Sequence, residues 1–154
     1  MINLRAFLLL AVSTVAACDT SPVPYNGAAR YAAINQMSVW RDPAVPGQFE
    51  VFTLAGAGPI DFWCAAGDYV TRGRGMATNA RIYLVAPVGP STIKSGSRSA
   101  VFTVLPKDAL QQAASSIPQS DYSLSLIRVG GNWRAAHVTQ NCKSLLFPFS
   151  ILAD

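Results

Sequence analysis

Residues 58–75 read GPIDFWCAAGDYVTRGRG, and this stretch carries the clearest helical pattern downstream of residue 18. One face of the pattern consists of Ile60, Trp63, Cys64 and Gly67. Because these residues recur at the spacing of a single helix face, the pattern predicts a helix of about three turns with one side against a core. Asp61 lies where a negative charge favours the positive end of the helix dipole, and the glycines near residue 75 favour the end of the helix.

The first 18 residues have the organisation of an export signal. Arg5 precedes an apolar run at residues 6–12, and small residues lead to Cys18. This pattern is typical of a secretory signal peptide. The apolar run is shorter than the roughly 20 residues that a membrane-spanning helix needs. We therefore predict that residues 1–17 are a cleaved signal peptide.

The end of this segment reads Val15-Ala16-Ala17-Cys18, which resembles the lipobox of bacterial lipoproteins. The resemblance covers residues 1–18 only. It implies that Cys18 becomes the diacylated N-terminus, so that membrane lipid is the first partner and residues 18–30 form a tether. The protein would then face the periplasm from a lipid anchor in the bacterial cell envelope. The alternative is an ordinary secretory signal ending near Ala17, which would give a soluble periplasmic or secreted protein.

The remaining residues, 31–154, have the length of a single domain. Short strands are predicted at residues 37–41, 48–54, 80–87, 100–105, 122–129 and 133–138, and a second short helix at 108–115. Residues 42–47 and 130–132 would close two hairpins, residues 28–36 fit a short helix or a turn, and residues 88–99 read as a mobile loop. These elements predict an α+β fold, with a mainly antiparallel sheet of four to six short strands and the 58–75 helix packed on one face.

The cysteines predict one cross-link. If Cys18 is acylated, Cys64 and Cys142 are the two that remain, and an oxidising compartment favours their pairing. Such a disulfide would fasten the helix to the last strand and contribute about 4 kcal/mol to stability. Cys64 could instead be a reactive nucleophile near a helix N-terminus. The disulfide is the stronger interpretation, because Cys142 is the partner that remains, and thioredoxin-like exchange has no support because no C-x-x-C occurs.

Catalytic patterns are sparse. His137 is the single histidine, and it could act as a general base together with Asp61 or Asp68, as in a small envelope hydrolase or transferase. However, no G-x-S-x-G motif, metal-ligand spacing or complete phosphate-binding glycine loop occurs, so we expect no metal and no cofactor. We therefore treat an enzyme as the alternative hypothesis.

Binding is the leading hypothesis. The formal net charge is +4 and 13% of residues are charged, but the arginines are scattered, so a nucleic-acid surface is not predicted. Trp133 next to Arg134 combines two residue types that concentrate binding energy at interfaces. We expect a tethered, non-enzymatic domain that binds an envelope protein or a cell-wall component. The apolar residues 145–152 would pack on the core or dock a partner.

Overall fold

The structure is a computed structural model, and it describes residues 30–121 and 123–146 of the 154-residue chain. Cys18 and residues 147–152 of the apolar C-terminal segment therefore lie outside the described residues. The strands are β1 (Arg30–Ala32), β2 (Ser38–Arg41), β3 (Gln48–Phe52), β4 (Arg81–Pro90), β5 (Arg98–Thr103) and β6 (Asn132–Arg134). The helices are α1 (Pro59–Asp68), α2 (Asp108–Ser115) and α3 (Ala135–Leu146), with a π-helical turn at Tyr69–Gly73 and a 3-10 turn at Gln119–Asp121.

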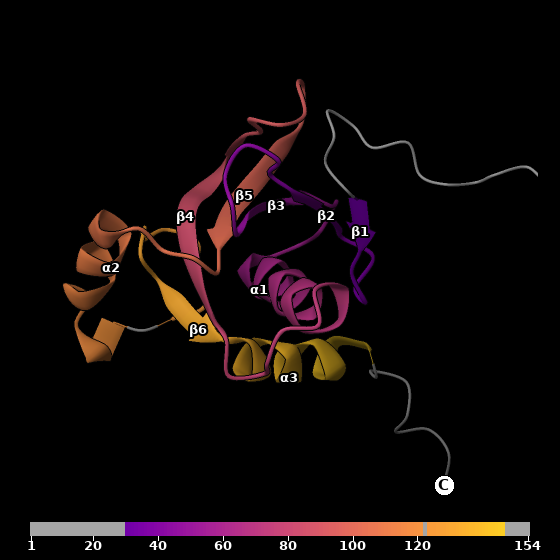
Figure 1. The fold of residues 1–154 in the computed structure, drawn as a ribbon. Coiled ribbons are helices and arrows are strands. Elements are labelled where there is room, and N and C mark those ends of the chain that lie inside the picture. Colours follow the sequence, from indigo (N-terminus) through magenta and orange to yellow (C-terminus); the bar gives the residue numbers. More distant parts are fainter. Residues whose placement is uncertain (1–29, 122, 147–154) are drawn as a thin grey trace, which may run out of the picture.

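All six strands form one antiparallel sheet in the order β1-β2-β3-β5-β4-β6. α1 lies between this sheet and α3, while α2 lies to one side (Figure 1). The expected α+β fold is thus confirmed, including the hairpin across residues 42–47 that joins β2 and β3. Within the described residues, no helix combines the length and the apolar character needed to cross a bilayer.

Alternation along the central strands produces two faces of different character. Phe49 and Val51 of β3 pack into the main core beneath α1, whereas Glu50 and Phe52 point to the opposite face. This division follows from the two-residue period of a strand. Residues 33–36 make a turn between β1 and β2, which resolves the choice between helix and turn. The loop predicted at residues 88–99 is shorter than expected, because β4 continues to Pro90 and β5 begins at Arg98.

The helix at residues 58–75 is confirmed, but its buried surface differs from the predicted stripe. Ile60 is 44% exposed, whereas every residue from Phe62 to Asp68 is buried. The physical reason is that α1 has the sheet on one side and α3 on the other (Figure 1). A helix enclosed on two sides is buried nearly all round and not along one stripe.

The contact between α1 and α3 depends on small side chains. A Cβ atom at Gly67 would lie 2.5 Å from Val138 Cγ2, so only glycine allows the two helices to approach this closely. One turn away, Cys64 and Cys142 form the predicted disulfide, with their Cα atoms 5.1 Å apart. The bridge joins two helices, and the expectation that Cys142 follows a terminal strand is wrong.

The second predicted hairpin is also wrong. Residues 123–129 form bends and a turn and no strand, and only the first two residues of the predicted 133–138 strand belong to β6. β6 pairs with β4 and is only three residues long, so it offers no extended partner for a hairpin. From Ala135 onward the chain is helical, with Ala135, Val138 and Cys142 buried along one face.

Candidate functional site

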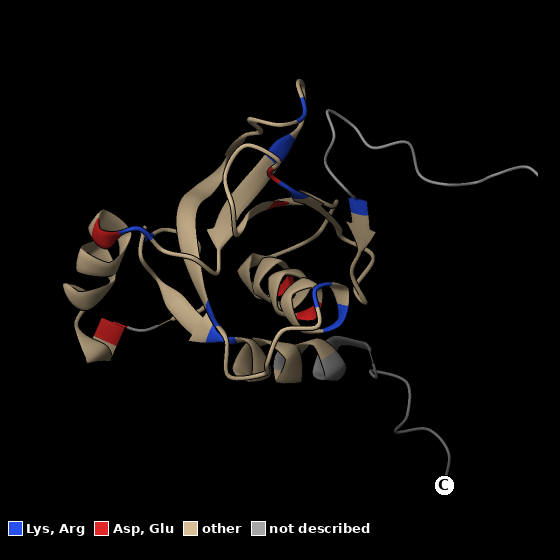
Figure 2. Ribbon diagram, in the orientation of Figure 1, with Lys and Arg blue, Asp and Glu red and all other residues tan. Residues whose placement is uncertain are grey.

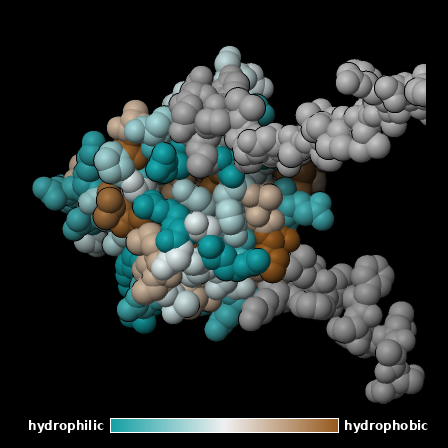
Figure 3. Space-filling model, turned by 45° about the vertical axis from the view of Figure 1, so that its right-hand side comes forward, coloured by the Kyte–Doolittle hydropathy of each residue, from teal (hydrophilic) through white to brown (hydrophobic). Residues whose placement is uncertain are grey.

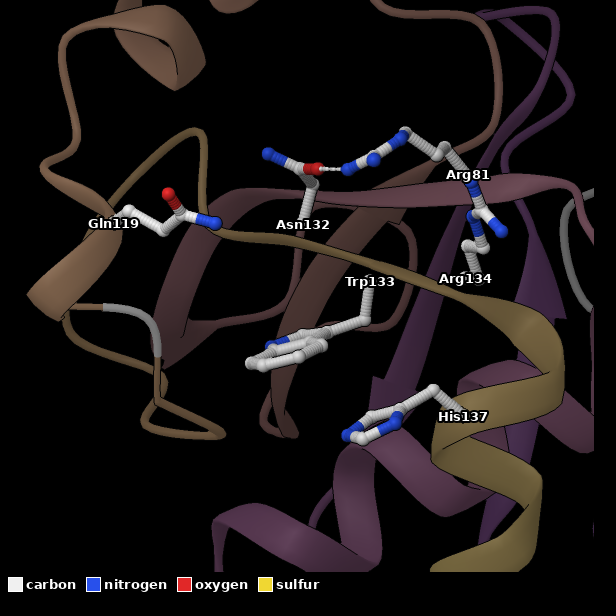
Figure 4. A pocket seen from close by; sticks show the side chains of 6 residues that line it. All are labelled: Arg81, Gln119, Asn132, Trp133, Arg134 and His137. Atoms are coloured by element: carbon white, nitrogen blue, oxygen red, sulfur yellow. Dashed lines mark hydrogen bonds between the residues drawn. The ribbon is translucent and has the colours of Figure 1, made fainter.

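A pocket of about 540 Å3 lies where the edge strand β6 passes into α3. Its lining residues are Arg81 from β4, Gln119 from the 3-10 turn, Asn132, Trp133 and Arg134 from β6, and His137 from α3 (Figure 4). The two residues that the sequence singled out for binding, Trp133 and Arg134, are therefore both placed here. None of the described lining residues is acidic, so this part of the pocket has a positive character.

Two arginines face each other across the strand pair. Arg81 and Arg134 are direct antiparallel partners in the β4–β6 register. Like charges at such positions repel each other, and the repulsion falls when an anion lies between or beside them. The Arg81 guanidinium donates a hydrogen bond to Asn132 Oδ1, and the Asn132 amide donates to the Gly130 carbonyl oxygen at 3.0 Å. Asn132 thus holds one of the two cations in a defined orientation.

On the other side of β6, Trp133 and His137 form an aromatic wall. Their rings stack with centroids 4.6 Å apart and planes inclined by 12° (Figure 4). The Trp133 indole N–H donates to the Ser123 carbonyl oxygen at 3.4 Å, which ties the ring to the segment before β6. Offset or parallel ring pairs of this kind present a flat apolar surface with polar edges. The pocket therefore combines an aromatic surface with guanidinium groups.

The carboxylates considered as catalytic partners of His137 lie elsewhere and have other roles. Asp61 Oδ2 accepts the Gly58 backbone N–H at 2.7 Å and so closes the N-terminus of α1. Asp68 is 2% exposed and accepts the Tyr31 hydroxyl at 2.8 Å and the Ile34 backbone N–H at 2.9 Å. Neither residue lines the His137 pocket.

The environment of Asp68 also fixes the protonation of Tyr31. Burial, and secondly the hydrogen bond to the Asp68 carboxylate, raise the pKa of Tyr31 to about 12. The phenol therefore remains a proton donor throughout the physiological range. Arg72 completes the group through an ion pair with Asp68 at 3.2 Å. These contacts fasten β1 and the following turn to α1, which is a structural role.

No nucleophile or metal cluster accompanies the pocket in the described part of the chain. Cys64, the candidate nucleophile, is bonded to Cys142. Among residues 30–121 and 123–146, no three His, Cys, Asp or Glu side chains are close enough to hold a metal ion. The described side chains of the pocket therefore offer a ligand hydrogen-bond donors, positive charge and aromatic surface.

Three lining residues, Arg81, Gln119 and Asn132, carry no signal in the sequence that marks them as part of a site. Arg81 was visible only as a polar residue of a strand, and Asn132 only as a turn residue after two glycines. Their convergence depends on the register that pairs β4 with β6, a contact between residues about fifty positions apart. Comparison of the chain with protein-family models, curated proteins and solved structures found no match.

Proposed function

We propose that this protein is a lipid-anchored domain of the bacterial cell envelope that binds a carboxylate-bearing ligand, either a cell-wall component or a protein segment. The observation that carries the proposal is the pocket at β6, where Arg81 and Arg134 join the Trp133–His137 stack in a lining that has no acidic member among the described residues. Arginine binds carboxylates through two parallel hydrogen bonds, and tryptophan supplies apolar contact area.

Binding is favoured over catalysis by the surroundings of His137. A general base needs a partner that orients it and a proton within hydrogen-bond reach. His137 stacks on Trp133, and Asp61 and Asp68 are hydrogen-bonded to groups outside the pocket. The hydrolase or transferase hypothesis therefore has no specific geometric support, while the arginine and aromatic side chains of the lining suit ligand recognition.

The surface around the domain is consistent with recognition by charge and hydrogen bonds. In the face shown in Figure 3, hydrophilic and hydrophobic residues are mixed, and the hydrophobic areas are small and separate. Large apolar patches mark many protein and membrane interaction sites. A face of this mixed character favours a polar ligand that engages a few arginine and aromatic side chains.

The proposed location of the protein rests on its leader. The lipobox-like residues Val15-Ala16-Ala17-Cys18 support acylation of Cys18 after cleavage, and strand β1 begins at Arg30, 12 residues later. A tether of that length reaches at most about 40 Å. The pocket would therefore bind ligands that lie close to the membrane in which the protein is anchored.

The test is binding of purified cell-wall sacculi, and of soluble acidic cell-wall fragments, to the full-length protein and its variants. Trp133→Ala and Arg134→Ala should each weaken binding by about 30-fold or more, since such truncations remove about 2 kcal/mol at interface hot spots. His137→Ala should weaken it only a few-fold through loss of the ring stack. Arg74→Ala, at an exposed arginine outside the pocket lining, is the matched control.

Circular dichroism must show that each variant is folded, because Trp133 also packs against the core. A second tryptophan variant, Trp133→Phe, keeps most of that packing and should retain intermediate affinity. If the folded Trp133 and Arg134 variants bind sacculi and fragments as the wild type does, and cross-linked envelope proteins are also unchanged, the pocket is not the binding site. If His137→Ala alone abolishes a cellular phenotype, the enzyme hypothesis replaces this one.

A further inference from the structure

A second positively charged surface lies on the opposite face of the sheet from α1. There Trp40, Phe52 and Ile93 form a small cluster separate from the main core. The loop at residues 91–97 covers this cluster and presents Lys94 above it. The Lys94 ammonium lies 5.5 Å from the Trp40 ring centroid and 5.7 Å from that of Phe52. Cation–π attraction therefore holds this charge in place at the surface.

The loop that carries Lys94 is fastened to the sheet from below. Glu50 of β3 is completely buried and accepts hydrogen bonds from Ser91, Thr92 and Ser99. This loop is therefore a fixed element of the surface, with Lys94 at a defined position above the sheet.

Two arginines complete the surface. Arg30 is the direct partner of Trp40 in the β1–β2 register, so its side chain starts from the same face. Arg98 begins β5 and donates to the Val88 carbonyl oxygen at 3.3 Å. Together with Lys94 these residues line a hollow of about 480 Å3, whose other members include Ser38, Thr53 and Ser97. No acidic residue lines it among residues 30–121 and 123–146, and Figure 2 shows basic residues at β1, at the start of β5 and in the loop before it.

We propose that this surface, which we call the Arg30/Lys94/Arg98 face, binds the anionic headgroups of the membrane in which the protein is anchored. Three cations and several hydroxyl groups around an open hollow match phosphate-bearing lipid headgroups in charge and hydrogen bonding. Trp40 and Phe52 are 8% and 7% exposed, so the face engages headgroups and does not insert rings into the bilayer.

The position of the tether selects a membrane as the occupant. Arg30 belongs to the face and follows Cys18 by only 12 residues in the sequence. The anchor and the cationic face are therefore at the same end of the chain, and this step rests on the proposed acylation of Cys18. Docking through this face would hold the domain in one orientation, with the β6 pocket on another part of the surface.

The experiment measures how the full-length protein distributes between two vesicle populations, one of phosphatidylcholine alone and one that also contains phosphatidylglycerol. Acyl chains insert into both populations alike, and any attraction of Arg5 in an uncleaved leader is the same for every variant, so a change in the ratio between variants reports the electrostatic part of binding that the face supplies. Each Lys or Arg near an anionic bilayer strengthens binding by about fivefold. The triple variant Arg30→Gln/Lys94→Gln/Arg98→Gln should therefore lose about 10- to 100-fold of the preference for anionic vesicles.

The matched control is Arg74→Gln/Lys107→Gln/Arg128→Gln, which removes the same charge from residues outside the hollow. It should keep most of the preference. Raising the salt concentration should suppress the preference in the wild type, because the Debye length falls from about 10 Å at 0.1 M to about 3 Å at 1 M. Millimolar glycerol phosphate should not compete, since a single free phosphate lacks the multiple contacts of a lipid surface.

Three outcomes would overturn the proposal. The two triple variants could show equal loss, which would assign the preference to net charge alone. Glycerol phosphate could displace the protein, which would make the hollow a site for a free phosphate compound. The Arg30/Lys94/Arg98 variant could keep its vesicle preference but lose binding to an acidic glycan or protein, which would make that macromolecule, and not the membrane, the ligand of the face. The same comparison in a Cys18→Ser background separates the two proposals: a preference that persists there supports the face even if acylation fails.

Discussion

The substitution Glu50→Gln should lower the stability of the fold and change how that stability depends on pH. The Glu50 side chain is 0% exposed, and its carboxylate accepts hydrogen bonds from Ser91 Oγ at 2.5 Å, Ser99 Oγ at 2.6 Å, Thr92 Oγ1 at 2.6 Å and the Thr92 N–H at 3.0 Å. Burial raises the pKa of this carboxyl, but the hydrogen bonds outweigh it, so the pKa is lower than its usual value. The charged form is therefore more stable in the folded protein than in water.

The Ser91 hydroxyl explains why glutamine cannot replace this carboxylate. Ser91 Oγ already accepts the Ile93 N–H at 3.2 Å and the Lys94 N–H at 2.9 Å. Its lone pairs are used, so it must donate its proton to residue 50 and cannot accept from a glutamine amide. A buried donor left unpaired costs about 1–3 kcal/mol, and a hydrogen bond to a neutral group is weaker by about 1 kcal/mol than one to a charged group.

Relief of the buried charge offsets part of this loss, and we expect Glu50→Gln to lower the free energy of unfolding by about 2–4 kcal/mol. Urea denaturation with the disulfide intact measures it, and the melting temperature should fall by about 10 °C. Asp121→Asn, at a half-exposed ion pair with Arg128, is the control and should change stability by less than about 1 kcal/mol.

The pH dependence gives an independent check. Because the folded pKa of Glu50 is lowered, its contribution to stability is fully present above about 4.5, the usual pKa of this carboxyl, and is lost as pH falls through the folded pKa. Wild-type stability should therefore decline on acidification below about pH 4.5 more steeply than that of Glu50→Gln. Equal stability of the two proteins, with parallel pH profiles, would refute the reasoning.

Three further predictions concern the helices and the anchor. Gly67→Ala should destabilise the fold by about 1–2 kcal/mol in urea denaturation, since overpacking against Val138 exceeds the gain in helix propensity; the effect should shrink in a Val138→Ala background. Replacing Cys64 and Cys142 together by alanine should remove about 4 kcal/mol, and peptide mapping without reductant that recovers two free thiols would contradict the bridge. Mass spectrometry of the membrane fraction should find a diacylglyceryl group on Cys18, whereas a soluble product with an unmodified N-terminus would rule out the anchor.

The prediction of the second hairpin failed for a reason visible in its residues. The alternation of Ser123, Leu124, Ser125 and Leu126 resembles a strand with one wet face, yet a strand forms only when a neighbour supplies hydrogen bonds along its edge. The predicted neighbour, residues 133–138, is a strand only as far as Arg134 and is helical from Ala135, so it offers no such edge. The helical spacing of Ala135, Val138 and Cys142 was present in the sequence, but the interpretation of residues 133–138 as a strand concealed it.

Local chemistry determined what the sequence could predict by itself. Apolar periodicity and a well-placed Asp61 define α1, turn residues between two apolar runs define the β2–β3 hairpin, and α2 begins and ends at the predicted residues 108 and 115. The pairing of Cys64 with Cys142 followed from the small number of cysteines. Each of these depends on residues close in the chain or on simple counting, so no three-dimensional contact was needed.

Only the tertiary structure decided which side chains share a surface. Glu50 reads as an ordinary polar residue of a strand until the loop at residues 91–97 folds over it. Arg81 meets Arg134, and Arg30 meets Lys94 and Arg98, through strand register and loop placement between distant segments. Contacts of this kind depend on how strands and loops are placed relative to one another, whereas each strand or loop is determined by its own residues. Both charged surfaces are therefore properties of the assembled sheet, and neither is visible as a run of basic residues.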